Sequence, residues 1–150
     1  MKQIKKVAAL TVLLSFCFFV SSSLADSDGI IKYRKNVMKS SGGHMGAIMD
    51  ILKNELPLQA HILDHARSIN QNSKMIMEMF PIGTGLGDTK AKPAIWENWS
   101  KFESAVNAFV RESSKLVKVA ESGDMKALAK QFRATGKTCG GCHKNFKKRE

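Results

Sequence analysis

The sequence has few cysteines, and this scarcity limits what its thiols can do. Of its 150 residues only three are cysteine, at positions 17, 139 and 142. Cys17 lies in an N-terminal segment that we expect to be removed, so the mature chain would keep a single pair, three residues apart. A disulfide that closes so short a loop adds little stability through chain entropy. A chemical role for Cys139 and Cys142 is therefore favoured over a structural one.

The chain also lacks the marks of a β-protein and of familiar enzyme sites. β-Branched residues are sparse, no alternation of apolar and polar residues persists, and no internal repeat or low-complexity segment is present. No nucleophile–base pair, phosphate-binding glycine loop or metal-binding carboxylate cluster is evident. We therefore expect a helical protein that is not an enzyme.

The first 25 residues have the layout of a secretory signal peptide. Three lysines precede a mostly apolar stretch over residues 7–20, and a small residue, Ala25, ends the segment SSSLA. The apolar stretch is short for a bilayer span of about 20 residues, and a small-residue cleavage site follows it, so a leader is favoured over a membrane anchor. We expect export to the periplasm and cleavage after Ala25, which would leave residues 26–150 as one domain. No later segment is long and apolar enough to cross a bilayer.

The composition is strongly basic. The formal net charge is +11, and loss of the leader with its three lysines and no acidic residue would lower it to +8. A basic surface attracts acidic proteins or anionic membrane surfaces, although it can equally serve solubility alone. Nucleic acid is disfavoured by export and by the lack of a basic–aromatic recognition pattern. We expect no nucleic acid partner and no stable membrane insertion.

Four amphipathic helices are predicted in the mature chain. Apolar residues recur every three to four positions over residues 28–53, 57–79, 93–120 and 125–148. Gly42 and Gly43 interrupt the first of these, so either that helix ends there or something bulky approaches its backbone. Because most of the loops are short, the pattern predicts an all-α, antiparallel up-down four-helix bundle, in which sites lie between facing helices.

The stretch KTCGGCHKNF, residues 137–146, places Cys139, Cys142 and His143 in the order C-x-x-C-H. A dithiol oxidoreductase would carry such a motif at a helix N-terminus near a βαβ unit, whereas here it lies inside a helix of a chain without strands. A closed zinc site would need a fourth ligand, and no other histidine has the spacing to supply it. His61 and His65, four residues apart, could form a small site of their own.

Attachment of a c-type haem is the third interpretation of this motif, and it fits best. Cys139 and Cys142 are three residues apart, so both sulfurs project to one side of a helix and can bond to the two vinyl groups along one porphyrin edge. His143 is four residues from Cys139, on the same side, and its ring can reach the iron. The spacing is the attachment signature of c-type haem, so we predict one covalent haem c.

With these motifs in place, the mature chain resembles the class II cytochromes c, which comprise the cytochromes c-prime and their low-spin relatives, the cytochromes c-556. The resemblance spans residues 28–148. It rests on GKTCGGCHKNFK close to the C-terminus, on IKYRKNVM in the first helix and on AKPAIWENWSKF at the start of the third. It implies an antiparallel four-helix bundle with the haem held near one end.

The resemblance also implies roles for individual residues. His143 would be the proximal iron ligand, Arg34 would lie close to a haem propionate, and Met38 would point to the distal side of the iron. Lys147 matches a basic position in the family and would lie over the proximal imidazole or stay solvated. Met38 can equally be part of the core, since methionine commonly fills gaps there, and the other methionines are expected in the core or at the surface.

The residue at the Met38 position separates two behaviours in this family. A ligating methionine gives six-coordinate, low-spin iron suited to electron transfer, whereas a residue that does not bind leaves five-coordinate, high-spin iron that binds nitric oxide or carbon monoxide. We predict a periplasmic monohaem electron carrier ligated by His143 and Met38. The alternative is a cytochrome c-prime that binds such gases, and the remote alternative is a dithiol oxidoreductase using Cys139 and Cys142. Redox proteins, some of them acidic, are the expected partners, and homodimer formation is left open.

Overall fold

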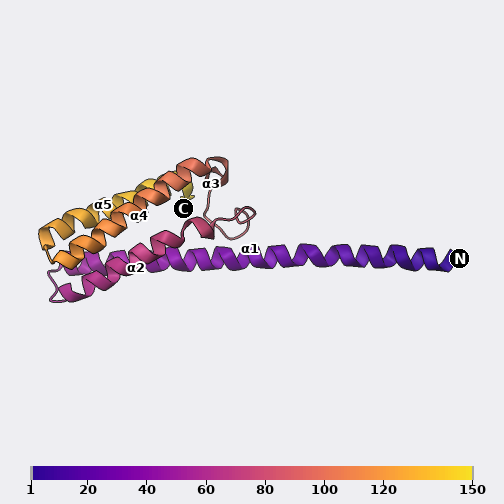
Figure 1. The fold of residues 1–150 in the computed structure, drawn as a ribbon, viewed down its shortest axis with the longest axis horizontal. Helices are drawn as coiled ribbons and strands as arrows, with labels where there is room; N and C mark the ends of the chain where they lie inside the picture. The colour runs from indigo at the N-terminus through magenta and orange to yellow at the C-terminus, as the bar shows by residue number, and fades with distance from the viewer. Residues whose placement is uncertain (1, 150) are drawn as a thin grey trace.

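The computed structural model is built almost entirely of helices (Figure 1). It describes residues 2–149, with side chains from residue 26 onward, so the side chains of the predicted leader lie outside the described part. Its elements are α1 (Lys2–Lys53), η1 (Gln59–His61), α2 (Ile62–Met75), η2 (Met77–Met79), α3 (Ala94–Glu97), α4 (Trp99–Ser122) and α5 (Met125–Phe146), of which η1 and η2 are single 3-10 turns. Over the described residues, no helix has an apolar stretch long enough to span a membrane.

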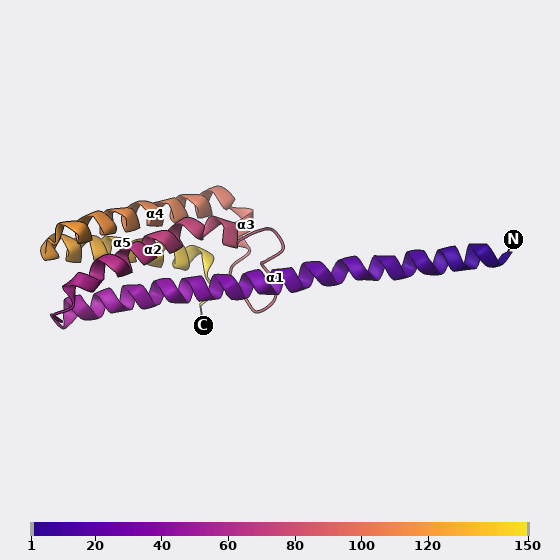
Figure 2. The same cartoon turned by 60° about the horizontal axis from the view of Figure 1, so that its bottom comes forward.

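The four long helices run alternately up and down and form the predicted bundle (Figures 1 and 2). Helix α1 packs on α2, α2 packs on α4, and α4 packs on α5, whereas α1 and α5 scarcely touch. We call the interface between two neighbouring helices of the bundle a seam. The bundle is therefore closely packed along three of its four seams. The prediction of an all-α, antiparallel four-helix bundle is confirmed.

The core is filled by the apolar faces of these helices. Phe102 of α4 lies at the centre of an aromatic cluster, with its ring centroid 4.9 Å from that of Phe80 and 5.4 Å from that of Phe146, both in edge-on geometry. Such pairs contribute about 0.5–1.5 kcal/mol each beyond the burial of their surface. The cluster fixes the end of α5 and the chain after η2 against α4.

The second predicted helix, over residues 57–79, is divided into three parts in the structure. Its first turn is the 3-10 turn η1, α2 begins only at Ile62 and ends at Met75, and η2 follows. Leu58 precedes η1 and provides no side-chain cap for the free amides, and uncapped helix ends often tighten into 3-10 geometry. The predicted helix was therefore too long at both ends.

The third predicted helix is broken near its start. Asn98 has φ −131° and ψ 53°, which are not helical angles, and it separates the single turn α3 from α4. The break accompanies a long-range contact, because the indole Nε1 of Trp96 donates to the carbonyl oxygens of Phe80 at 3.0 Å and Pro81 at 3.2 Å. This contact ties α3 to the chain after η2.

The paired glycines of α1 do not end that helix. Helix α1 continues through Gly42 and Gly43, and a Cβ atom at either position would meet no neighbouring atom within 4 Å. Neither glycine is therefore required by a close approach of another part of the chain. Gly42 instead borders a cavity, so space is left there for a group that the protein itself does not supply.

Helix α5 begins where the sequence predicts. Gly123 adopts a left-handed conformation with φ 70° and ends α4, and the carboxylate Oδ1 of Asp124 accepts hydrogen bonds from the amides of Lys126 at 3.0 Å and Ala127 at 2.9 Å. An aspartate in this position satisfies amides that have no partner within the helix. Asp124 thus fixes the start of the helix that carries the C-x-x-C-H motif.

We predict that Asp124→Ala lowers the free energy of unfolding by about 1 kcal/mol. Asp124→Asn should retain most of the stability, because an asparagine oxygen caps equally well. Asp50→Ala, which removes an exposed carboxylate from α1, is the control. Urea unfolding followed by circular dichroism measures all three, and equal losses for Asp124→Ala and Asp50→Ala would contradict the capping role.

Candidate functional site

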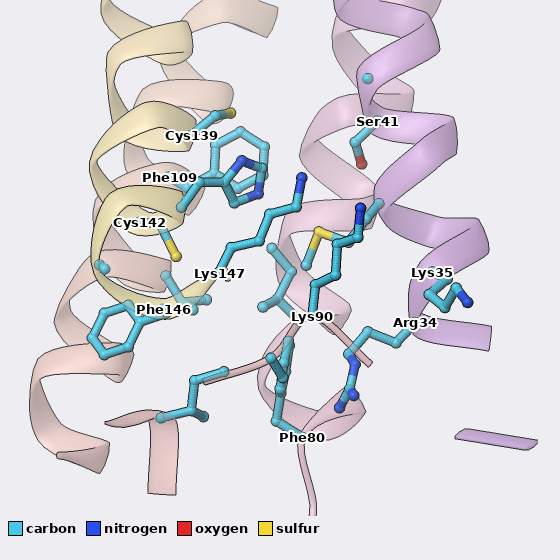
Figure 3. Close-up of a pocket in the computed structure, with 18 of the residues that line it drawn as sticks. Arg34, Lys35, Ser41, Phe80, Lys90, Phe109, Cys139, Cys142, Phe146 and Lys147 are labelled. Carbon is cyan, nitrogen blue, oxygen red and sulfur yellow. The ribbon is translucent and has the colours of Figure 1, made fainter. Parts of the chain in front are cut away.

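A cavity of about 540 Å³ opens between α1 and α5, along the seam where these helices scarcely touch. Its volume lies within the range of roughly 300–1,000 Å³ that is usual for sites of small molecules and cofactors. Phe102, Val106 and Phe109 of α4 supply apolar lining, and the two walls come from α1 and α5. Figure 3 shows the two walls facing one another across the cavity.

The α5 wall carries both cysteines. Cys139 and Cys142 line the cavity as free, half-buried thiols, and their side chains lie on the cavity side of α5 in Figure 3. Burial raises the pKa of the Cys139 thiol, and burial together with Cys139 raises the pKa of Cys142 to about 11. Both groups therefore remain protonated thiols near neutral pH, unlike the acidic thiols of redox motifs.

His143 lines the same cavity, as the motif spacing predicts. Part of its side chain faces solvent, but the protein around it and the nearby Lys147 both lower the pKa of its imidazole. The neutral imidazole is the form that binds a metal ion. The structure thus brings Cys139, Cys142 and His143 together at one wall.

The opposite wall is formed by α1. Met38 lines the cavity and is half-buried against the hydrophobic core, as is Met45, two turns further along the helix. A Cβ atom at Gly136 of α5 would lie 3.6 Å from Cε of Met45, so Met45 reaches across the seam. From the sequence, Met45 is expected in the core or at the surface. Met38 and Met45 are seven residues apart, which is two helical turns, so both lie on one face of α1.

Arg34 also borders the cavity, but its guanidinium is bound by the protein itself. The side chain is buried, with 4% of the residue exposed, and lies 4.4 Å above the Phe80 ring. Its Nη1 donates to the carbonyl oxygen of Met79 at 3.1 Å and to Oγ1 of Thr84 at 3.2 Å. Its Nη2 donates to the Thr84 carbonyl at 3.0 Å and to Oγ1 of Thr89 at 2.7 Å. Arg34 therefore ties α1 to the chain after η2, and its contact with a propionate stays a prediction.

Further cations stand around the cavity. Lys35, Lys39, Lys90 and Lys147 all line it, and in Figure 3 the side chains of Lys90 and Lys147 lie in the space between the two walls. Lys35 pairs with the carboxylate of Asp88 at 2.6 Å. Among these four lysines, only Lys147 is singled out by the sequence, and there it is expected to lie over the proximal imidazole or to stay solvated.

Lys90 reaches the cavity because the long connection before α3 folds back onto the end of α5. The amide of Lys92 donates to the Phe146 carbonyl at 3.0 Å, and the amide of Lys148 donates to the Lys90 carbonyl at 2.8 Å. These bonds surround an isolated bridge between Ala91 and Lys147. The periodicity of apolar residues does not predict this contact between the connection before α3 and the end of α5.

The residues present fit a covalently held haem. Apolar side chains would cover a flat macrocycle, two thiols on one wall can form thioethers, and a neutral imidazole on that wall can ligate iron. Cations at the border of the cavity can offset the negative charge of the haem carboxylates. The parts of the chain that the structure describes contain no cluster of three or more histidine, cysteine or acidic residues placed to hold a metal ion.

Comparisons with known proteins agree with this geometry. The sequence profile described as Cytochrome C′ matches residues 29–147. Cytochrome c′ of Rhodospirillum rubrum is 34% identical over 148 residues, covering 98% of this chain and 99% of that protein. Cytochrome c-556 of Agrobacterium tumefaciens (strain B2A) is 34% identical over 120 residues, covering 79% and 97%.

Solved structures have the same fold. Cytochrome c prime from Shewanella frigidimarina aligns with a TM-score of 0.78 and 31% identity, covering 82% of this chain and 97% of that one. The nitric oxide complex of a mutant cytochrome c prime from Alcaligenes xylosoxidans aligns with a TM-score of 0.77 and 26% identity, covering 83% and 97%.

We predict that haem stays with the wild-type chain through extraction with acidified organic solvent, because carbon–sulfur bonds to Cys139 and Cys142 hold it. The double variant Cys139→Ala/Cys142→Ala should release all its haem, and Thr138→Ala, a neighbouring change on α5, should release none. Absorbance of the extracted protein measures the retained haem. Extraction of the haem from the wild type, or retention of the haem by the double variant, would contradict the assignment of thioether bonds to Cys139 and Cys142.

We also predict that Arg34→Met lowers the free energy of unfolding of the haem-loaded protein by about 3 kcal/mol, since four buried or half-buried acceptors lose their donor. Lys35→Met removes only an exposed ion pair and should cost roughly 0–1 kcal/mol. Urea unfolding gives both values. If Arg34→Met costs no more than Lys35→Met, the anchoring role of Arg34 is wrong.

Proposed function

This chain belongs to the cytochrome c′ family of covalent c-type haem proteins, and we propose that it is an exported protein that binds small diatomic gases. The match to cytochrome c′ of R. rubrum covers nearly the whole chain. Related structures have been solved with nitric oxide and with carbon monoxide. The relatives of this chain are haem proteins rather than classical enzymes.

The observation that carries the proposal is the lack of a nitrogen ligand on the α1 side of the cavity. His143 on α5 is the one imidazole that lines the cavity within the described residues. His44, the only histidine of α1, is turned towards His65 of α2, with 3.0 Å between their Nδ1 atoms. The remaining candidate ligands on the α1 wall include the soft thioethers of Met38 and Met45.

When bound, the haem supplies an iron that can take up a diatomic gas or exchange one electron. His143 would provide the proximal nitrogen, and burial, followed by the nearby Lys147, lowers the pKa of its imidazole, which favours the neutral form. Phe109 and Val106 exclude water, which favours a small uncharged ligand over a hydrated ion. The open space at Gly42 adjoins the α1 wall, where such a ligand can be accommodated.

Electron transfer with Met38 as a second ligand is the other candidate function, and it was the leading prediction from the sequence. Met38 lines the cavity, and a cytochrome c-556 is as similar in identity as the cytochrome c′ relative, although over less of the chain. A thioether ligand favours reduced iron. The lysines around the cavity would then bind an acidic redox partner protein. The longer match and the gas-bound structures favour gas binding.

We predict that the reduced wild-type protein binds carbon monoxide readily, and that Met38→Ala changes the affinity by less than about tenfold, which corresponds to 1.4 kcal/mol. If Met38 ligates iron, its removal must instead raise the affinity strongly and convert a low-spin absorption spectrum into a high-spin one. Met49→Ala changes an exposed methionine of the same helix, 46% accessible, and is the control. Titration with carbon monoxide, followed by absorbance, decides between the two functions.

A further inference from the structure

A second pair of nitrogen donors lies outside the cavity, where α1 packs on α2. His44 of α1 and His65 of α2 face each other with their Nδ1 atoms 3.0 Å apart. Their ring centroids are 5.2 Å apart, and the ring planes are tilted by 47°. Both residues are half-buried, so their side chains are held by the packing of the two helices and remain accessible to ions from solution.

We propose that His44 and His65 form a binding site for a divalent transition metal ion, with Cu²⁺ bound most tightly. The site is separate from the haem and independent of which gas or partner the haem serves. A two-histidine site leaves several positions on the metal open. It therefore binds less strongly than a closed structural site with four protein ligands.

The separation of the two nitrogens supports this assignment. Imidazole nitrogens lie about 2.0–2.1 Å from a bound metal ion, so two nitrogens at a right angle on one ion are roughly 2.9 Å apart. The observed separation of 3.0 Å is close to this value, so binding needs little change in the distance between the two nitrogens. Neighbouring nitrogens at right angles are typical of tetragonal Cu²⁺ and Ni²⁺ sites, and Cu²⁺ has the highest affinity among divalent first-row metals.

The surroundings of His65 also suit a cation. Burial lowers the pKa of His65, and His44 and His61 lower it further, while Asp64 raises it. A metal ligand must be unprotonated, and burial, which is the largest of these effects, favours the neutral imidazole with a free nitrogen lone pair. Asp64 adds a negative charge close to the pair. No third histidine, cysteine or acidic residue completes a three-ligand group within the described residues, so water would occupy the open positions.

Only one half of this site could be expected from the sequence. His61 and His65 are four residues apart and were expected to share a helix face, but His61 lies in the turn η1 and is exposed. The partner of His65 is instead His44, 21 residues earlier in the chain. A hydrogen bond between two neutral imidazoles would also bring the nitrogens this close, and it is the alternative that the experiment must separate from metal binding.

The test is titration of the haem-loaded ferric protein, cleaved after Ala25, with Cu²⁺ alone. We expect one equivalent to bind with an unchanged haem absorption spectrum, and the copper electron paramagnetic resonance signal should show coupling to two nitrogens. Because loss of even an outer-shell partner weakens metal binding by 10–100-fold, His44→Asn and His65→Asn should each weaken it by at least about tenfold. Asparagine can preserve a polar contact between the helices, which keeps the fold intact.

His61→Asn is the matched control and should leave the affinity within about twofold, which is less than 0.5 kcal/mol. The double variant His44→Asn/His65→Asn measures copper bound elsewhere on the protein. The proposal is overturned if the double variant binds Cu²⁺ as tightly as the wild type, if His61→Asn weakens binding as much as His44→Asn, or if the copper signal shows no nitrogen coupling. Circular dichroism verifies that each variant is folded.

Discussion

The molecule is organised around the open seam between α1 and α5. Three seams of the bundle are closed by apolar side chains, but along the fourth the helices scarcely touch and a cavity of about 540 Å³ remains. Apolar surface such as that of Phe109 gains about 25 cal/mol for each Å² that is removed from water. A flat apolar macrocycle that fills the seam therefore stabilises the bundle, so haem binding and folding are coupled.

The chain between α2 and α4 sets the border of this seam. Arg34 fixes α1 to it through Thr84 and Thr89, and the Ala91–Lys147 bridge fixes it to the end of α5. The same segment thus holds both walls, and Met79, Phe80 and Ile95 also bury it in the hydrophobic core. Because α1 and α5 are joined mainly through this connection, we expect it to determine the width of the cavity and the position of the lysines around it.

The parts of the site that depend on neighbours along one helix could be predicted from the sequence. The placement of Cys139, Cys142 and His143 on one wall follows from spacings of three and four residues, and the bundle follows from apolar periodicity and family resemblance. The break at Asn98, the tie of Lys90 to α5, the anchoring bonds of Arg34 and the pairing of His44 with His65 could not be predicted. Each depends on a contact between residues far apart in the chain, which periodicity does not encode.

We propose that the seam holds a haem ligated by His143 on the α5 side and by no protein atom on the α1 side. On this proposal Met38 stays in the α1 wall and the iron binds gases, whereas a bond from Met38 to the iron would favour electron transfer. Resonance Raman spectroscopy of the reduced wild-type protein reports coordination number and spin state directly. We expect five-coordinate, high-spin iron, and a six-coordinate, low-spin spectrum would contradict the proposed coordination.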